Sequence, residues 1–228
     1  MLKLGLGLSL SSIRPQGVWL PTDEASVVAW YQKAEGITLN GSNVSAWADS
    51  ATAVPYDMAQ TNANEQPAYS AGVLTFDPTT YTQNLQTSAQ ISLSGQFTVG
   101  VKCNPAAYNN ILIGDNTTTN EFFKFLTGGK ILRIKIDGTS VDLTLNGSDT
   151  FGDDYIVITR NGSNLITVNR NGVAQTDTET LAGTADIDAI GVRSVDTNPY
   201  DGTVSELQIF SSTSAALTAY VNNRLSNL

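Results

Sequence analysis

The chain of 228 residues contains no histidine and only one cysteine, Cys103. Without histidine, neither a Ser-His-Asp nor a Cys-His nucleophile system can form. Most zinc, copper and non-haem iron sites also lose their commonest ligand. A single cysteine makes no intrachain disulfide, and the alternating segment FTVGVKC predicts that Cys103 is a small buried hydrophobe rather than a reactive thiol. The chemistry that remains is that of carboxylates and of calcium bound by oxygen ligands.

Charge is sparse as well. Charged residues make up 14% of the chain and hydrophobic residues 41%, which is enough for a sizeable core and unlike a disordered chain. The net charge of −9 disfavours nucleic acid and anionic membrane surfaces as partners. No segment approaches the roughly 20 apolar residues that a membrane-spanning helix needs. We therefore expect neither nucleic acid nor a membrane as a partner.

The stretch 155–175 carries the clearest structural signal in the chain. Two Asn-Gly steps, Asn161-Gly162 and Asn171-Gly172, separate three runs rich in Ile, Val and Thr. A type I′ hairpin turn needs positive φ at both central residues, and Asn followed by Gly accepts this at the least steric cost. The flanking runs suit a pleated, half-buried surface. The stretch therefore predicts a three-stranded antiparallel meander.

Short apolar runs with turn signals between them continue along the rest of the chain. The expected strands are 27–32, 37–47 as a hairpin, 73–78, 91–103 with a turn at Ser94-Gly95, 110–115, 121–126, 130–136, 140–145, 186–193 and 202–210. Residues 214–228 predict the one convincing helix, with Ser214 as its N-cap. Its expected apolar face consists of Leu217, Tyr220, Val221, Leu225 and Leu228. This spacing of short strands is typical of a β-sandwich or barrel.

The first seventeen residues predict an extended N-terminal arm, so that one folded domain covers 18–228. Leu2, Leu4, Leu6, Leu8 and Leu10 alternate with small or polar residues and lie on one face of an extended chain. A signal peptide would have a longer unbroken apolar core and an A-x-A-like cleavage site. We expect the leucine face to be docked, either on its own domain or on a neighbouring chain by strand addition.

Three sets of residues are candidates for chemistry. Asp186 and Asp188 have the spacing of an acid pair on one strand face, but a solvated strand face is the favoured interpretation. Asp49, Asp77, Asp115 and Asp201 border expected strands and are weak calcium candidates, with turn-forming aspartates as the alternative. Trp30 and Trp47 lie in apolar strand contexts, which favours core packing over sugar stacking.

The order of motifs resembles the laminin-G / concanavalin-A-like jelly-roll superfamily, in particular single-domain members in structural proteins of tailed phages. The resemblance covers roughly residues 25–226. It rests on four segments: Trp47-Ala48-Asp49-Ser50, Leu74-Thr75-Phe76-Asp77, 167–172 and 200–210. Ala51 and Pro78 stand where glycine is usual, beside loops that hold ligand or calcium in some relatives. The E-x-D-x-x-E strand of related glucanases is missing, so the resemblance implies an antiparallel jelly-roll β-sandwich without a catalytic site.

Two functions follow as expectations from this resemblance. The first is a non-enzymatic virion component, a capsid decoration protein or tail appendage, that docks through the leucine arm onto other virion proteins or a second copy of the chain. Its expected location is the virion, assembled in the host cytoplasm. The alternative is a carbohydrate-binding module that recognises a host-surface glycan. No cofactor is expected beyond the weakly indicated calcium.

Overall fold

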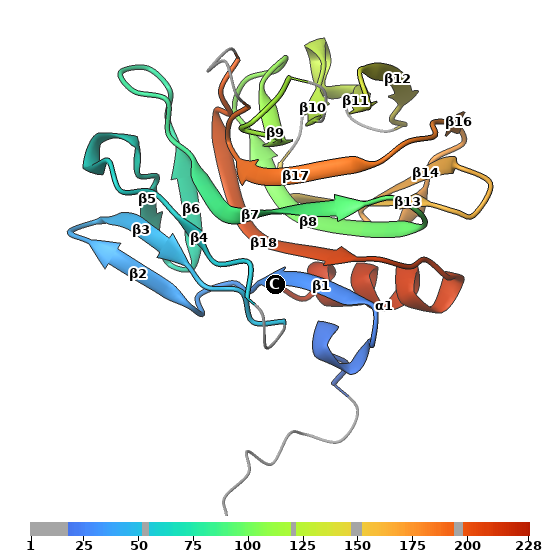
Figure 1. Ribbon diagram of the computed structural model, residues 1–228, viewed down its shortest axis with the longest axis horizontal. Helices are drawn as coiled ribbons and strands as arrows, with labels where there is room; N and C mark the ends of the chain where they lie inside the picture. The colour runs from blue at the N-terminus through green and yellow to red at the C-terminus, as the bar shows by residue number, and fades with distance from the viewer. Residues whose placement is uncertain (1–17, 52–54, 120–121, 147–151, 194–197) are drawn as a thin grey trace, which may run out of the picture.

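A computed structural model describes residues 18–51, 55–119, 122–146, 152–193 and 198–228. The described residues form antiparallel β-strands and one α-helix, α1 (Ala215–Ser226), which confirms the all-β sandwich with a short C-terminal helix (Figure 1). The strands are β1 (Val27–Tyr31), β2 (Ile37–Asn40), β3 (Asn43–Trp47), β4 (Met58–Ala59), β5 (Ala68–Ser70), β6 (Val73–Phe76), β7 (Leu85–Leu93), β8 (Phe97–Pro105), β9 (Ile111–Gly114), β10 (Phe122–Phe125), β11 (Ile131–Ile136), β12 (Thr139–Thr144), β13 (Asp154–Arg160), β14 (Leu165–Arg170), β15 (Val173–Ala174), β16 (Glu179–Thr180), β17 (Ala185–Ile190) and β18 (Gly202–Phe210). Single turns of 3-10 helix are η1 (Pro21–Asp23), η2 (Ala63–Glu65) and η3 (Thr127–Gly129).

The strands stack in two layers. The helix-side sheet has the order β14–β13–β8–β18, with β1 and β6 both paired to β18, and β15 and β16 both paired to β14. The groove-side sheet has the order β4–β7–β17–β9–β10–β11–β12. Strands β2, β3 and β5 link the two sheets at one end of the molecule. In Figure 1, β10 to β12 of the groove-side sheet lie at the top and α1 lies below.

Alternating side chains fill the space between the sheets. On β11, Leu132, Ile134 and Ile136 are buried, whereas Arg133 and Lys135 between them are only half-buried. On β8, Cys103 continues the buried series that begins at Phe97, as expected. Burial raises the pKa of the Cys103 thiol to about 12, so this group is a packed hydrophobe rather than a nucleophile.

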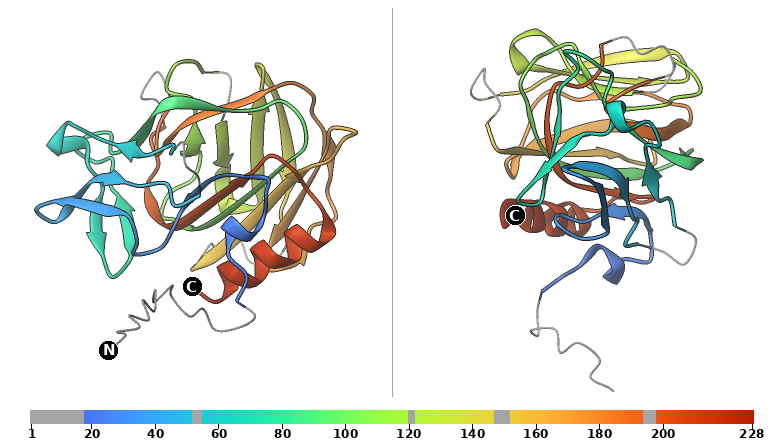
Figure 2. Two further views of the ribbon diagram at one scale, coloured as in Figure 1. Left: turned by 60° about the horizontal axis from the view of Figure 1, so that its bottom comes forward. Right: turned by 90° about the vertical axis from the view of Figure 1, so that its left-hand side faces the viewer.

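Helix α1 covers the outer face of the helix-side sheet (Figure 2). The Ser214 side chain accepts a hydrogen bond from the Leu217 amide at 3.0 Å, which confirms the predicted N-cap. Leu217, Val221 and Leu225 are buried against the sheet, whereas Tyr220 is 45% exposed, so its place on the apolar face was predicted wrongly. A Cβ at Gly100 on β8 would lie only 2.4 Å from Val221 Cγ1. The absence of a side chain there allows the helix to lie close to the sheet.

The predicted meander is present, but one of its two turns differs from the prediction. Asn171 and Gly172 have φ values of 51° and 76°, as a type I′ turn requires. Between β13 and β14 the loop is longer, and the left-handed residue is Asn164 at φ 62° rather than Gly162. The Asn161 side chain accepts hydrogen bonds from the amides of Ser163 and Leu165, which stabilises the longer loop.

A buried carboxylate joins the C-terminal helix to the helix-side sheet. Glu206 on β18 is fully buried and forms an ion pair with Arg224 of α1. It also accepts hydrogen bonds from Trp30 Nε1, the Lys33 amide and Gln208 Nε2 at 3.0, 3.2 and 2.8 Å. The Arg224 guanidinium lies over the Trp30 ring, 4.6 Å from its centroid. These contacts satisfy the buried charge, so we assign Glu206 a structural role. Among the described residues, no helix is long and apolar enough to cross a membrane.

Candidate functional site

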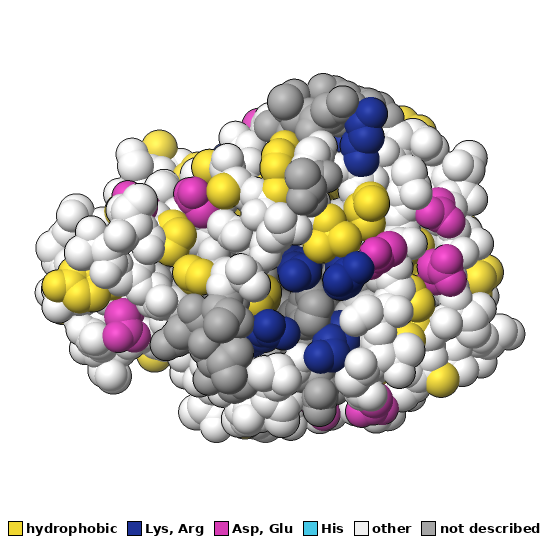
Figure 3. All heavy atoms as spheres, turned by 90° about the horizontal axis from the view of Figure 1, so that it is seen from above, with side chains coloured by type: hydrophobic (Ala, Val, Ile, Leu, Met, Phe, Trp, Pro, Cys, Tyr) yellow, Lys and Arg dark blue, Asp and Glu magenta, His cyan; other side chains and the backbone are white. Residues whose placement is uncertain are grey.

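The outer face of the groove-side sheet is the candidate site, because the one α-helix of the described residues packs on the other sheet. Figure 3 looks down on this face. Strand register places one row of residues across it: Ala59, Gln86, Ala189 and Gly114 on β4, β7, β17 and β9. Three of these four residues are small. Ala189 and Gly114 are buried, whereas Ala59 is exposed and leaves a low floor beside the Gln86 side chain.

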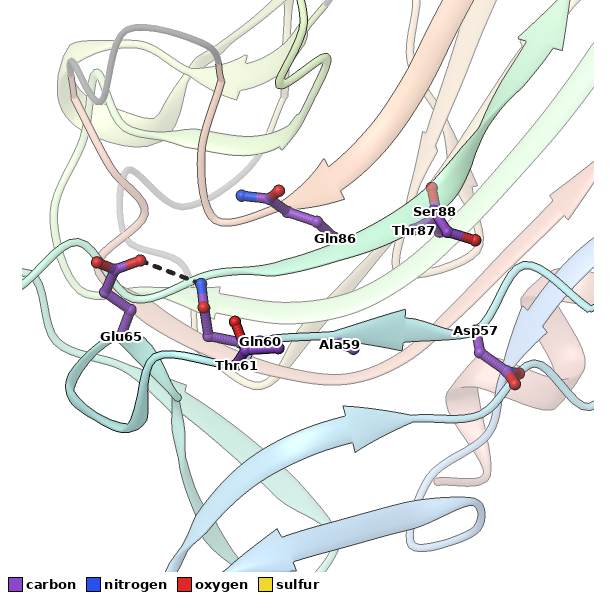
Figure 4. Close-up of a pocket in the computed structure, with 8 residues that line it drawn as sticks. All are labelled: Asp57, Ala59, Gln60, Thr61, Glu65, Gln86, Thr87 and Ser88. Atoms are coloured by element: carbon purple, nitrogen blue, oxygen red, sulfur yellow. Dashed lines mark hydrogen bonds between the residues drawn. The ribbon is translucent and has the colours of Figure 1, made fainter.

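A groove of about 500 Å³ lies where β4 pairs with β7 (Figure 4). Its lining consists of Asp57, Ala59, Gln60, Thr61, Glu65, Gln86, Thr87 and Ser88. Apart from Ala59, every lining side chain carries a hydroxyl, amide or carboxylate group. In Figure 4, Asp57 and Glu65 lie at opposite ends of the groove, with Gln60 and Gln86 between them.

Side-chain amides beside the groove form a hydrogen-bonded chain. Asn84 Oδ1 accepts from Gln60 Nε2 at 2.9 Å and from Gln86 Nε2 at 2.8 Å. Gln86 Oε1 in turn accepts from Asn116 Nδ2 at 2.9 Å. Gln60 Nε2 also donates to Glu65 at 3.2 Å. Because the amides hold one another, their donors and acceptors have fixed directions before any ligand binds.

Asp186 and Asp188 both accept hydrogen bonds, and Asp188 is buried, so the expectation of a solvated strand face is wrong for Asp188. Asp186 accepts a hydrogen bond from Ser92 Oγ at 2.5 Å, and Asp188 accepts one from the backbone N–H of Asn116 at 2.5 Å. The pairing of β17 with β7 shifts register between Ile187 and Ala189, which interrupts the regular spacing of the strand at Asp188. Burial raises the pKa of Asp188, and the negative charges of Asp115 and Asp186 raise it further. Asp188 thus fixes the loop at Asn116, which carries one end of the amide chain.

Beyond β9, the same face carries positive charge. Lys124 on β10 lies directly opposite Arg133 on β11, which lies opposite Asp142 on β12. Arg133 and Asp142 form a bidentate ion pair with two contacts of 2.6 Å. Lys135 and Arg193 both donate to the carbonyl oxygen of Thr119, at 2.7 and 3.4 Å. We call Lys124, Arg133, Lys135 and Arg193 the cation cluster.

Gly114 explains how Arg193 joins this cluster. A Cβ at Gly114 would lie 2.3 Å from the carbonyl oxygen of Val192 and 3.2 Å from Cβ of Arg193. The segment that follows β17 therefore crosses the outer face of β9 directly over this glycine. Any larger residue at position 114 would displace the segment and move Arg193 away from β10 and β11.

The four calcium candidates are not gathered at one place. Asp49 accepts from the amides of Trp30 and Ala51, both at 2.8 Å. Asp115 accepts from the amides and hydroxyls of Thr117 and Thr118. These bonds are those of turn-forming aspartates, and they lower the pKa of Asp115 against the opposing effect of burial.

Asp77 and Asp201 do lie near each other. Burial raises the pKa of Asp201, and the charge of Asp77 adds to this rise. Asp77 itself accepts a hydrogen bond from the Thr79 amide at 3.0 Å. In the described part of the chain, no group of three or more acidic or thiol side chains is placed to hold a metal ion.

The predicted docking residues Leu2, Leu4, Leu6, Leu8 and Leu10 lie outside the described residues. Docking through the arm, partners in a virion and the virion location therefore stay predictions. Of the tryptophans, Trp30 and Trp47 are buried, as expected. Trp19 instead stacks on Tyr220 with ring centroids 5.4 Å apart, beside a second hollow of about 410 Å³ next to α1.

The sequence carries no signal for the amide chain, although it carries one for part of the cation cluster. Lys124, Arg133 and Lys135 lie at outward positions of two alternating segments joined by Gly128-Gly129, so pairing the segments as a hairpin would have placed them together. Gln60, Asn84 and Gln86 lie in polar segments without periodicity. Arg193 follows a strand, and its position depends on the close approach at Gly114.

Comparison with known proteins identifies the fold. No family model matches the chain, and no curated protein matches it. A Trypanosoma rangeli sialidase in complex with sialic acid is similar at a TM-score of 0.60 and 11% identity, over 90% of this chain and 33% of the sialidase. The botulinum neurotoxin type G receptor-binding domain is similar at a TM-score of 0.56 and 13% identity, over 89% of this chain and 51% of that domain.

A third structure is a CBM40 domain of a Ruminococcus gnavus sialidase bound to alpha2,6 sialyllactose. The alignment covers 56% of this chain and 83% of the CBM40 domain at 12% identity. Its TM-score of 0.43 is too low to establish a common fold. The chain spans only one third of the trypanosomal sialidase and about half of the toxin domain. At such low identities the likeness shows the fold alone, which is the jelly-roll β-sandwich.

Proposed function

We propose that the protein is a non-catalytic carbohydrate-binding module that holds a glycan in the groove between β4 and β7. The observation that carries the proposal is the chain of side-chain amides beside that groove, in which Gln60 and Gln86 are held by Asn84. A sugar hydroxyl both donates and accepts hydrogen bonds, and a side-chain amide offers both functions. The volume of about 500 Å³ also falls within the usual range for a small-ligand site.

The fixed geometry of these amides supports binding. Gln86 is half-buried, and its two amide atoms are bonded to Asn84 and Asn116. Side chains that are already ordered lose little further entropy when a ligand arrives, so more of the contact energy appears as affinity. Within the described residues, one N–H of the Gln86 amide is left for a ligand, because its bond to Asn84 uses only the other.

The carboxylates of the groove favour binding over hydrolysis. Glycoside hydrolysis needs two carboxyl groups that flank the scissile bond. Asp57 accepts a hydrogen bond from the Asp49 amide at 2.8 Å. Glu65 accepts from Gln60 at 3.2 Å and from Asn62 at 2.6 Å, at the other end of the groove. Both carboxylates are thus engaged in organising their loops.

The comparisons agree with a glycan ligand without carrying the proposal. One similar structure is a sialidase in complex with sialic acid. The same sandwich hosts many unrelated tasks, so the groove rather than the fold supports a glycan ligand.

The test is a screen of the purified chain against an array of neutral and acidic oligosaccharides, followed by calorimetry on those that bind. Gln86→Ala removes an amide of the groove, and Ala59→Trp fills its floor. Gln90→Ala, an exposed residue further along β7, is the matched control. We expect Gln86→Ala to weaken binding about two- to tenfold, as for the loss of one or two hydrogen bonds. We expect Ala59→Trp to abolish binding and Gln90→Ala to leave it unchanged.

Two results would overturn the proposal. One is an array with no binder. The other is a glycan whose affinity is the same for the wild type, Gln86→Ala and Ala59→Trp, because that glycan would bind elsewhere. Thermal unfolding of each variant establishes that the protein is folded.

A further inference from the structure

The like charges of the cation cluster repel one another, and the pairing of the strands does not require them. Lys124 and Arg133 are directly opposite each other on neighbouring strands, and like charges in that position destabilise a sheet. Partial burial lowers the pKa of Lys124, and the charges of Arg133, Arg193 and Lys135 lower it further. All four side chains are half-buried. An anionic group placed among these four side chains would be attracted by each of them.

The cluster stands out against the composition of the whole chain. The protein carries 21 acidic and 12 basic residues, yet a third of the basic ones gather on this small area. Figure 3 shows Lys and Arg side chains close together on this face. Charges further away than about 8 Å are largely screened at physiological ionic strength. Among the described residues, the charges that act on Lys124 are therefore three cations and one carboxylate, Asp142, although the net charge of the chain is −9.

We propose that the cation cluster binds the carboxylate or sulfate group of an acidic glycan. This inference rests on the proposed function, since the remaining sugars of the same glycan would occupy the groove. Guanidinium groups pair with carboxylate and sulfate oxygens through two parallel hydrogen bonds, and ammonium groups add point charges. From β7 to β10 there are three strand spacings, or about 14 Å. An oligosaccharide of a few units is long enough to span that distance, and it would pass over the Val192–Arg193 segment that crosses β9.

The surroundings of the cluster favour a sparsely charged glycan over nucleic acid. Asp142 is already paired with Arg133, and Asp115, Asp186 and Asp188 lie further along the same face. A nucleic acid carries a phosphate on every nucleotide, so some of its phosphates would meet these carboxylates. A glycan with isolated acidic groups can place one group on the cluster and neutral sugars beside the aspartates.

The experiment compares acidic sugars with neutral partners that have the same skeleton. Lactose 3′-sulfate is measured against lactose for sulfate, and digalacturonate against its dimethyl ester for carboxylate, all at millimolar concentration by calorimetry. Lys124→Gln and Arg193→Gln each remove one charge of the cluster. Lys33→Gln removes one charge on the other side of the molecule, where Lys33 bonds to Leu228, and is the matched control.

We expect at least one acidic probe to bind more tightly than its neutral partner. Each cluster variant should weaken that binding about fivefold, and Lys33→Gln should leave it unchanged. The preference should shrink as salt is added. A sulfate-only or carboxylate-only preference identifies the acidic group and supports the inference.

The other outcomes separate the two proposals. Equal binding of acidic and neutral probes that depends on Gln86 would overturn the cation-cluster inference and leave the proposed function standing. Acidic binding that is lost in Lys124→Gln but unaffected by Gln86→Ala and Ala59→Trp would overturn the proposed groove and leave the cluster standing. No binding of either acidic probe, or binding of single-stranded DNA at least as tight as that of the acidic sugars, would overturn the inference.

Discussion

Replacing Glu206 with glutamine tests whether the buried ion pair anchors the C-terminal helix. The Glu206 side chain is 0% exposed and that of its partner Arg224 is 12% exposed. Every polar contact of this carboxylate is a donor: two nitrogens of Arg224, Trp30 Nε1, Gln208 Nε2 and the Lys33 amide. A glutamine must turn its NH2 group toward at least two of these donors, whichever way its amide is oriented. The variant also leaves the largely buried guanidinium of Arg224 without its Glu206 counter-charge.

We expect Glu206→Gln to lower the free energy of unfolding by about 3–5 kcal/mol, as for breaking one side of a buried pair. Asp142→Asn is the matched control, because it makes the same change from carboxylate to amide. Its ion pair with Arg133 has side chains 39% and 35% exposed, so we expect a loss of at most about 1 kcal/mol.

The assay is urea unfolding followed by tryptophan fluorescence, with two buried tryptophans as reporters. The two variants should differ severalfold in their loss of stability, and added salt should change only the Asp142→Asn difference appreciably. Equal losses, or a loss under about 1 kcal/mol for Glu206→Gln, would refute the reasoning from burial.

Three further predictions concern packing and protonation. Gly100→Val should destabilise the protein by about 1–3 kcal/mol, since its side chain would collide with Val221, and hydrogen exchange should show loosening first in α1; unchanged protection of α1 would contradict this. Cys103, with a pKa raised to about 12 by burial, should react with a disulfide reagent at pH 8 only after denaturant is added, and rapid labelling of the native protein would be the contrary result. Burial raises the pKa of Asp188, so the folded protein is more stable when this carboxyl group is protonated. That extra stability is lost as the pH rises through the pKa of the folded state. Asp188→Asn should therefore melt at a higher temperature than the wild type at pH 7 and at the same temperature near pH 3, and a lower melting temperature at pH 7 would contradict the assignment.

Sequence patterns predicted those parts of the fold that depend on local periodicity. The alternation of Leu132, Ile134 and Ile136 placed β11 with one face in the core, and Ser214 marked the start of α1. Strand β7 begins at Leu85, although sequence analysis placed the strand start at residue 91. All of the residues Gln86 to Gln90 except Ala89 are polar, and none of the five is buried, so they carry no alternating signal. The strand begins there because β4 pairs with Gln86 and Thr87 on one side and β17 pairs with Gln86 on the other.

The candidate site was harder to predict, because it arises from contacts between distant segments. The amide chain joins Gln60, Gln86 and Asn116, which come together only when β4, β7 and β9 enter one sheet. The net charge of −9 is an average over the whole chain. It disfavoured anionic partners although four cations gather at β10 and β11. The folded distribution of charge, rather than its sum, determines what a surface attracts.

The measurement that tests the account most directly is the location of a bound glycan by amide chemical shifts, using an oligosaccharide that binds on the array. The account predicts that the perturbed amides gather on β4, β7 and the loop at Asn116. For an acidic oligosaccharide they should extend to β10 and β11. Perturbations confined to the helix-side sheet or to the hollow beside Trp19 and Tyr220 would contradict it.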